Sequence, residues 1–390
     1  MIKVMSIFGT RPEAIKMAPV IQELKRYSNI ESIVCVSAQH REMLDSVLQI
    51  FKIVPDYDMN IMKHGQTLQS ITTAILEGLD PILTKEKPDI ILVHGDTTTT
   101  FAAALSAFYH QIPIGHVEAG LRTYEKYSPY PEEMNRQMVS CMADLNFAPT
   151  ETSALNLIKE HKNKDAIYIT GNTAIDALKT TIHDTYHNED LEWAKGSRLI
   201  LLTAHRRENQ GDGLTHIFEG VKDIVHAHPD VKVLYPCHMN PAIQTLAHEM
   251  FDQEDRIRVI DPLDVIDFHN VIQHSTLVLT DSGGIQEEAP SLNKPVLVLR
   301  DTTERPEGIE AGALKLVGTN RHTIFQMADE LLTNKELYQK MSNAINPYGD
   351  GNASKRIASI LLQYFHEEEP QMTNRIVLPV IHEGILVHER

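Results

Sequence analysis

The chain has 390 residues, of which 42% are hydrophobic and 23% are charged, which is ordinary for a globular protein of two or three domains. Its formal net charge of −17, without a long Lys/Arg run, argues against nucleic acid as a partner but not against a small phosphorylated ligand. No apolar run approaches the ~20 residues of a membrane span, so we expect no membrane partner. Three scattered cysteines, Cys35, Cys141 and Cys237, are typical of a reducing cytoplasm, and the apolar runs around Cys35 and Cys237 predict that both are buried.

The chain begins with an apolar strand over residues 2–8, a turn over 9–13 and a helix over 14–24. Pro12 in the turn suits a first helical position, and the planar guanidinium of Arg11 suits phosphate oxygens. An arginine at a turn also forms surface salt bridges, so Arg11 alone does not establish a phosphate site.

Apolar runs alternate with segments of helical periodicity along both halves of the chain. Strands rich in Val, Ile and Leu and separated by helices favour parallel sheets that are covered on both faces. We therefore predict two doubly wound α/β domains of about six strands each rather than one barrel. The predicted strands span residues 2–8, 32–37, 89–94, 112–117, 145–148, 166–170, 198–203, 232–236, 257–260, 277–280, 295–299 and 314–317.

The domain boundaries follow from this strand order. We place an N-terminal Rossmann-like domain at residues 1–171 and a C-terminal one at residues 172–352. A helix over residues 353–366 has no strand after it, and we expect it to cross back onto the N-terminal domain. Residues 367–390 form a tail to which the sequence assigns no role.

Carboxylates follow the predicted strands of the first half. Ligands of open parallel sheets bind beyond the carboxyl ends of the strands, where Asp96 and Glu118 lie, and Glu132 opens a later helix. Three carboxyl groups in one cleft can raise one another's pKa values and supply an acid/base pair. Each also has a structural alternative: Asp96 as the N-cap of a helix, Glu118 as a partner of Arg122, and Glu132 as a complement to a helix dipole.

The second half carries groups suited to a diphosphate. His205 follows the strand 198–203 and is next to Arg206 and Arg207, a cationic cluster that can stabilise a leaving diphosphate. Two domains whose strand ends face each other would bring these groups and the carboxylates of the first half into one central cleft.

The segment Ser282-Gly283-Gly284 connects the strand 277–280 to a helix. Such a turn directs backbone N–H groups and the positive end of the helix dipole at an anion such as phosphate. Two glutamates follow within one helical turn, where carboxylates can accept hydrogen bonds from ribose hydroxyls.

Motifs for common cofactors are absent from the sequence. Neither G-x-G-x-x-G nor G-x-x-x-x-G-K-[ST] occurs, so neither a nicotinamide nor P-loop chemistry is predicted. Asp56-Tyr57-Asp58 matches the D-x-D of metal-dependent glycosyltransferases, but it lies in a predicted edge strand, and we predict no metal.

Six segments together resemble the non-hydrolysing UDP-N-acetylglucosamine 2-epimerases of bacteria. They occur in matching order, and the resemblance extends to about residue 365. It implies a GT-B-type fold of two Rossmann-like domains around a central cleft, a homodimer, and no metal or other cofactor. The segments are residues 8–16, 94–97, 117–123, 131–136, 205–209 and 281–290.

The chemistry implied by this resemblance inverts carbon 2 of UDP-GlcNAc to give UDP-ManNAc, a precursor of cell-wall polysaccharides. UDP is eliminated to leave a 2-acetamidoglucal, and it adds again after the proton returns on the other face. The resemblance assigns acid/base and catalytic roles to Asp96, Glu118, Glu132, His205 and Lys16. It assigns UDP and substrate binding to Arg11, Lys16, His205, Phe268, Ser282, Gly283, Gly284, Glu288 and Arg305.

Many bacterial members of this family carry a second UDP-GlcNAc site that activates the enzyme. The residues that match it are Gln39, His40, Glu132, Arg206 and His238. Glu42 stands where a Gln is common, and Gly65 stands where an Arg is common. Because the missing Arg is a bidentate donor to an anionic ligand, we expect weakened or altered activation by substrate.

Three other functions remain open from the sequence. A hydrolysing epimerase would release ManNAc and UDP, and a GT-B glycosyltransferase would need an acceptor site. The acidic trio favours proton transfer at the sugar over glycosyl transfer. A catalytically inactive nucleotide-sugar sensor is disfavoured because Asp96, Glu118, Glu132 and His205 are all present.

Overall fold

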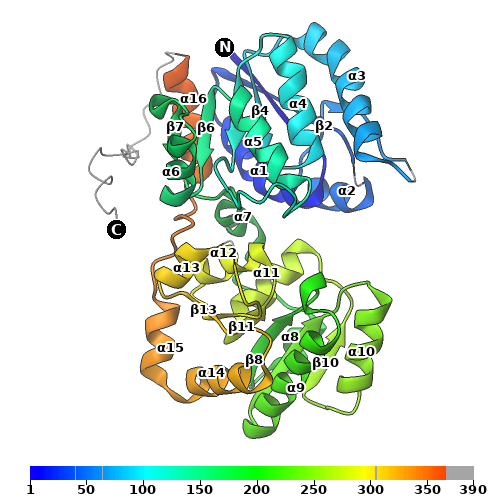
Figure 1. Cartoon of the computed structure of the whole chain (residues 1–390), viewed down its shortest axis with the longest axis vertical. Helices are drawn as coiled ribbons and strands as arrows, with labels where there is room; N and C mark the ends of the chain where they lie inside the picture. The colour runs from blue at the N-terminus through cyan, green and yellow to red at the C-terminus, as the bar shows by residue number, and fades with distance from the viewer. Residues whose placement is uncertain (40, 64, 304, 366–390) are drawn as a thin grey trace. The chain divides into compact units, whose positions relative to one another are not determined.

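The computed structural model describes residues 1–39, 41–63, 65–303 and 305–365 (Figure 1). The chain forms two compact units. The first contains Met1–Ala177 and the described residues 349–365, and the second is Leu178–Tyr348. Each unit is built around its own parallel sheet.

The first unit contains a seven-stranded sheet of order β3-β2-β1-β4-β5-β6-β7. Helices α3, α4 and α5 pack side by side on one face, and α2, α1 and α16 form the other group (Figure 1). The strands are β1 (Ile2–Phe8), β2 (Ile30–Val36), β3 (Tyr57–Asp58), β4 (Ile90–His94), β5 (Ile114–Val117), β6 (Leu145–Ala148) and β7 (Ile167–Ile169). The helices are α1 (Arg11–Leu24), α2 (Arg41–Ile50), α3 (Leu68–Glu86), α4 (Thr98–Tyr109), α5 (Glu132–Met142), α6 (Glu151–Lys159), the 3-10 helix η1 (Lys164–Ala166) and α16 (Ala353–Tyr364).

The second unit contains a six-stranded sheet of order β10-β9-β8-β11-β12-β13. Its first helix, α7 (Thr173–Thr181), begins in the first unit. The strands are β8 (Arg198–Thr203), β9 (Val231–Pro236), β10 (Ile257–Ile260), β11 (Leu277–Thr280), β12 (Val296–Val298) and β13 (Leu314–Leu316). The remaining helices are α8 (Glu189–Ala194), η2 (Arg207–Asn209), α9 (Asp212–Ala227), α10 (Pro241–Phe251), α11 (Val265–His274), α12 (Gly283–Ser291), α13 (Pro306–Glu310), α14 (Arg321–Thr333) and α15 (Lys335–Ser342).

The two sheets share one topological feature. In each, the order of strands reverses between two central neighbours, β1 and β4 in the first unit and β8 and β11 in the second. The carboxyl ends of strands on either side of such a reversal are the usual ligand site of an open α/β sheet. The turns that follow these four strands carry several of the predicted site residues, among them Asp96, His205, Arg206 and Ser282.

The predicted doubly wound architecture is confirmed, and the strand boundaries differ from those predicted by at most two residues. The short edge strand at Asp56-Tyr57-Asp58 is also present, as β3 paired with β2. The first helix begins at Arg11, so Pro12 is its second residue and not its first, because Thr10 adopts the extended backbone of an N-cap.

The strands are apolar because both faces of each sheet are covered. Cys35 and Cys237 are buried, as predicted. In the second unit the rings of Tyr235 and Phe251 lie 5.4 and 4.7 Å from that of Phe218, measured between centroids. Among the described residues, no helix combines the length and the apolar character that a bilayer crossing requires.

Helix α16 returns to the first unit and packs against α1 (Figure 1). Its first two backbone N–H groups, from Ala353 and Ser354, donate to the carboxylate of Asp176 at 3.1 and 2.8 Å. The guanidinium of Arg356 donates to the carbonyl of Thr170 at 3.0 Å. The units divide at Ala177/Leu178 and Tyr348/Gly349, and the tail predicted at residues 367–390 lies outside the described residues.

A buried carboxylate joins the two turns at the reversal point of the first sheet. Glu13 is 2% exposed, and its Oε2 accepts hydrogen bonds from the backbone N–H groups of Gly9 and Thr10 at 3.0 and 2.8 Å. Its Oε1 accepts from the hydroxyls of Thr97 and Thr100 at 2.7 and 3.0 Å. Glu13 therefore ties the start of α1 to the start of α4.

Replacement of this carboxylate with an amide tests its structural role. Glu13→Gln presents an NH2 group to donors that require an acceptor, so we expect the free energy of unfolding of the first unit to fall by about 3 kcal/mol. Glu31→Gln, on the exposed part of β2, is the matched control and is expected to change it by less than ~0.5 kcal/mol. Urea denaturation followed by circular dichroism measures both, and equal midpoints for the two variants would contradict this role.

Candidate active site

Asp96 lies in the turn between β4 and α4 and is oriented by two residues of α5. Its Oδ2 accepts from Nε and Nη2 of Arg136 at 2.9 and 2.8 Å, and its backbone carbonyl accepts from the amide of Asn135 at 2.8 Å. The N-cap of α4 is Thr97, whose hydroxyl accepts from the backbone N–H of Thr100. The N-cap alternative for Asp96 is therefore wrong, and the Asp96 carboxylate makes an ion pair instead.

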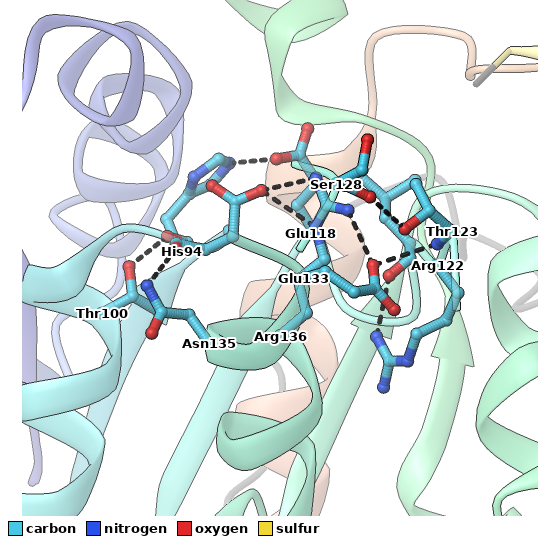
Figure 2. A network of polar contacts seen from close by, with 12 residues as sticks. His94, Thr100, Glu118, Arg122, Thr123, Ser128, Glu133, Asn135 and Arg136 are labelled. Carbon is cyan, nitrogen blue, oxygen red and sulfur yellow. Dashed lines mark hydrogen bonds and ion pairs between the residues drawn. The ribbon is translucent and has the colours of Figure 1, made fainter. Parts of the chain in front are cut away.

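Glu118 follows β5 in a left-handed backbone conformation, with φ of 63°. Its side chain is only 8% exposed. Its Oε1 is paired with the ammonium of Lys16 and accepts from the amide of Asn172 at 3.0 Å. The Nε2 atom of His94 lies 3.7 Å from Oε2, and Figure 2 shows the imidazole pointing towards this carboxylate. Two predicted site residues, Lys16 and Glu118, are thus in direct contact.

The alternative in which Glu118 pairs with Arg122 is also wrong. The guanidinium of Arg122 is fully buried and pairs with Glu160, with 2.6 Å between Nε and Oε1. Glu160 follows α6, so this ion pair fastens the loop after β5 to the neighbouring helix.

The two glutamates at the start of α5 have different environments. Glu133 is fully buried and accepts from the backbone N–H groups of Thr123 and Tyr124 at 3.0 and 3.1 Å (Figure 2). Burial alone would raise the pKa of Glu133, but hydrogen bonds from Thr123, Gln137 and Tyr124 outweigh it and hold this pKa below the ordinary value. Within the described part of the chain, Glu132 Oε2 is buried without a hydrogen-bond partner, which leaves this oxygen for a ligand.

Two buried histidines adjoin these carboxylates and were not among the predicted site residues. Burial lowers the pKa of His94 and that of His116 to about 4 each. His116 Nε2 lies 2.8 Å from the carbonyl oxygen of Gly95 and holds the turn that leads to Asp96. Both histidines lie within buried strands, where a polar side chain is costly unless it is paired, and this is the signal by which the sequence could have identified them.

At the reversal point of the second sheet, a second buried carboxylate orients the predicted histidine. Asp281 is fully buried, and its Oδ2 accepts from the backbone N–H groups of His205 and Arg206, both at 2.8 Å, and from the amide of Asn209 at 3.0 Å. These bonds hold the loop after β8 against the end of β11. The centroids of the His205 and His238 rings are 5.3 Å apart.

The ionisation of His205 follows from its surroundings. Burial lowers the pKa of His205, the carboxylate of Asp281 opposes this shift, and the positive charge of Arg206 adds to it. The imidazole is therefore neutral at pH 7 and can donate or accept a hydrogen bond.

Helix α12 begins at the predicted glycine turn. Ser282 is its N-cap residue and makes no side-chain capping bond, and the first N–H groups of an α-helix have no acceptor within the helix. A Cβ atom on Gly283 would lie 3.4 to 3.6 Å from the guanidinium of Arg305. Arg305 Nε donates to Glu287 Oε1 at 2.7 Å, which fixes the guanidinium beside the helix start. A helix N-terminus and a guanidinium therefore lie together, and both are groups that favour an anion.

His269 of α11 lies next to Glu288, the carboxylate that is predicted to contact the ribose. His269 Nε2 is 3.5 Å from Glu288 Oε2, and His269 Nδ1 is 2.7 Å from the hydroxyl of Thr181. Phe268 is half-buried and packs against the core of the second unit.

The residues that match a second ligand site are distributed over both units. In the first unit, Gln39 Oε1 accepts from the hydroxyl of Thr99 at 3.1 Å. In the second unit, His238 is exposed and its Nδ1 accepts from the backbone N–H of Asn240 at 3.0 Å. Arg11 is exposed at the start of α1, and His40 lies outside the described residues.

Two doubly wound sheets, with carboxylates at the reversal point of one and a helix N-terminus beside a guanidinium at that of the other, define a two-domain Rossmann-like protein. Residues 22–362 match the model of the UDP-N-acetylglucosamine 2-epimerase family. The chain belongs to this family.

Individual relatives agree with this assignment. The UDP-N-acetylglucosamine 2-epimerase of Bacillus subtilis (strain 168) is 58% identical over 371 residues, which are 95% of this chain and 98% of that protein. The crystal structure of a putative UDP-N-acetylglucosamine 2-epimerase from Listeria monocytogenes has a TM-score of 0.90 and 55% identity, over 94% of this chain and 98% of that one. The Neisseria meningitidis UDP-GlcNAc 2-epimerase bound to UDP-GlcNAc has a TM-score of 0.85 and 49% identity, over 93% and 100%. These similarities confirm the predicted family and its GT-B-type fold.

Proposed function

We propose that this chain interconverts UDP-GlcNAc and UDP-ManNAc by inverting carbon 2 of the sugar, without hydrolysis. The observation that carries this proposal is the largely buried pair of Lys16, on the helix after β1, and Glu118, at the end of β5, next to the end of β4 that precedes Asp96. Carboxylates held this way are suited to proton transfer. The UDP-GlcNAc bound by the Neisseria relative supports the choice of substrate.

The reaction begins with an elimination. A carboxylate removes the proton from carbon 2, the electron pair of that C–H bond forms a double bond between carbons 1 and 2, and the bond from carbon 1 to the diphosphate oxygen breaks. UDP leaves with the bonding electron pair, which gives 2-acetamidoglucal. In the return step the diphosphate oxygen attacks carbon 1, and a carboxylic acid delivers a proton to the opposite face of carbon 2.

The first unit supplies the groups for both proton transfers. Asp96, Glu118 and Glu132 are the candidates, and which of them is the base and which the acid stays open. The ammonium of Lys16 favours the ionised form of Glu118, since opposite charges in contact stabilise each other. Oε2 of Glu132 has no hydrogen-bond partner among the described residues, so it is suited to contact a ligand.

The second unit supplies the groups that hold UDP. The start of α12, with Ser282, Gly283 and Gly284, and the guanidinium of Arg305 offset the charge of the diphosphate. A neutral His205 donates a hydrogen bond to the departing oxygen. Glu288 accepts from the ribose, and Phe268 contacts the nucleotide.

Nuclear magnetic resonance of the anomeric protons tests this function. We expect purified protein incubated with UDP-GlcNAc alone to produce UDP-ManNAc and no free ManNAc. Glu118→Gln, which retains shape but cannot exchange a proton, is expected to lower kcat by at least ~100-fold. Free ManNAc would indicate a hydrolysing enzyme, and a lack of turnover would favour a transferase or a sensor.

The role of Arg305 is testable by binding alone. Loss of its charge-assisted hydrogen bonds in Arg305→Ala is expected to weaken UDP binding about 10- to 100-fold, as measured by isothermal titration calorimetry. Arg321→Ala removes an arginine of the same unit that pairs with Asp223 on the surface, and it should bind UDP normally. Equal affinity of the two variants would count against this assignment of the diphosphate position.

We also propose that activation by a second UDP-GlcNAc is weakened. Gly65 has no side chain, so it offers no cation at the position where members of this family commonly have an Arg. Its φ is 74°, and no described atom lies within 4 Å of the place where its Cβ atom would stand. Initial rates are therefore expected to rise hyperbolically with UDP-GlcNAc, whereas pronounced sigmoidal kinetics would contradict the proposal. A cytoplasmic homodimer that needs no added cofactor stays a prediction.

A further inference from the structure

We propose that His94 is a positioning residue for Glu118: its Nε2–H group donates to Glu118 Oε2, orients that oxygen and favours the ionised carboxylate. This inference rests on the proposed function and takes Glu118 as the base, the role that an ionised carboxylate paired with Lys16 suits.

The position of His94 carries the proposal. It is the last residue of β4 and is 3% exposed. Its Nε2 lies 3.7 Å from Glu118 Oε2 and, among the described residues, has no hydrogen-bond partner. A buried polar atom without a hydrogen-bond partner is costly in free energy. We therefore expect Nε2 of His94 to form a hydrogen bond in the functional state of the protein. A small rotation of either side chain closes the gap to a hydrogen bond.

The two oxygens of Glu118 face different groups. Oε1 is paired with Lys16 and Asn172, which fix one end of the carboxylate. Oε2 lies above the turn after β4, where a Cβ on Gly95 would come within 3.2 Å of it. A glycine at this turn thus leaves room for Oε2 on this side, and Figure 2 shows the imidazole of His94 and the carboxylate of Glu118 facing each other.

Burial keeps the ring of His94 neutral. It is the largest of the influences that together lower the pKa of His94 to about 4: Lys16 and His116 act in the same direction, and Glu118 and Asp96 oppose them. A neutral imidazole carries one N–H donor, and it can support Glu118 without adding a second full positive charge beside Lys16.

The other buried histidine of this region has a different task. His116 Nε2 lies 2.8 Å from the carbonyl oxygen of Gly95, so it holds the backbone of the turn and not a carboxylate. Of the two histidines, His94 is therefore the one that acts on Glu118.

The test compares the pH dependence of kcat and KM in wild type, His94→Phe and His94→Gln. Loss of the donor in His94→Phe is expected to lower kcat about 10- to 100-fold, with KM within about threefold, because Glu118 is misplaced. Loss of the donor also destabilises the ionised form of Glu118 relative to the protonated form. The acidic limb of the kcat/KM profile is therefore expected to move to higher pH by about one unit. His94→Gln restores an N–H donor near the Nε2 position, and it should return the limb towards wild type.

His228→Gln is the matched control. His228 is buried, and its Nε2 lies 2.9 Å from Asp329 in the second unit, so the same chemical change there should leave the limb in place. Thermal unfolding reports whether each variant is folded. If His94→Phe does not fold, His94→Asn takes its place, because the amide of Asn is too short to reach Glu118.

The outcomes separate the two proposals. An acidic limb that is unchanged in His94→Phe or His94→Asn, whatever the change in kcat, overturns the positioning role and leaves His94 a packing residue. Wild-type protein that does not epimerise UDP-GlcNAc overturns the proposed function itself.

Discussion

The buried carboxylate of Glu13 is the constraint on which the first half of the site depends. One of its oxygens accepts from the turn that opens α1, and the other accepts from threonines at the start of α4. Burial raises the pKa of Glu13, and hydrogen bonds from Thr97, Thr10, Gly9 and Thr100 oppose that shift. Because such a network stabilises only when its members are all paired, the helix that carries Lys16 and the turn that carries Asp96 are held in one arrangement.

In the second unit, the buried carboxylate of Asp281 holds the loop after β8 in the same way. This carboxylate accepts from the backbone of the loop, which fixes the backbone of His205 and Arg206, and the Nε of Arg206 donates to the carbonyl of Asp281 at 3.3 Å. Each sheet thus places a buried carboxylate where the strand order reverses. Hydrogen bonds to these carboxylates hold the backbone there, and several of the groups proposed to react or bind lie in the turns just beyond. Precise positioning of a catalytic group requires such support.

The sequence predicted the fold because apolar β-type runs and helical periodicity are local signals. Strand ends were correct within two residues, since the strands are buried on both faces. The family could be predicted from motif order, and the contact of Lys16 with Glu118 agrees with the joint placement of these residues at one site.

The partners of the site residues could not be predicted from the sequence. The short-range alternatives were wrong because each was outcompeted: Thr97 caps α4 in place of Asp96, and Arg122 pairs with Glu160, 38 residues away, in place of Glu118. Arg136 and Asn172 reach Asp96 and Glu118 only because α5 and the segment after β7 pack beside these turns. Such contacts depend on tertiary packing, which spacing along the chain does not encode.

The central claim is that a carboxyl group of the first unit removes and returns the proton on carbon 2. The most direct measurement is mass spectrometry and proton NMR of UDP-ManNAc formed from UDP-GlcNAc in D2O. A carboxyl group that exchanges with solvent predicts one deuterium at carbon 2 of the product. Product that retains the original hydrogen at carbon 2 would contradict this account.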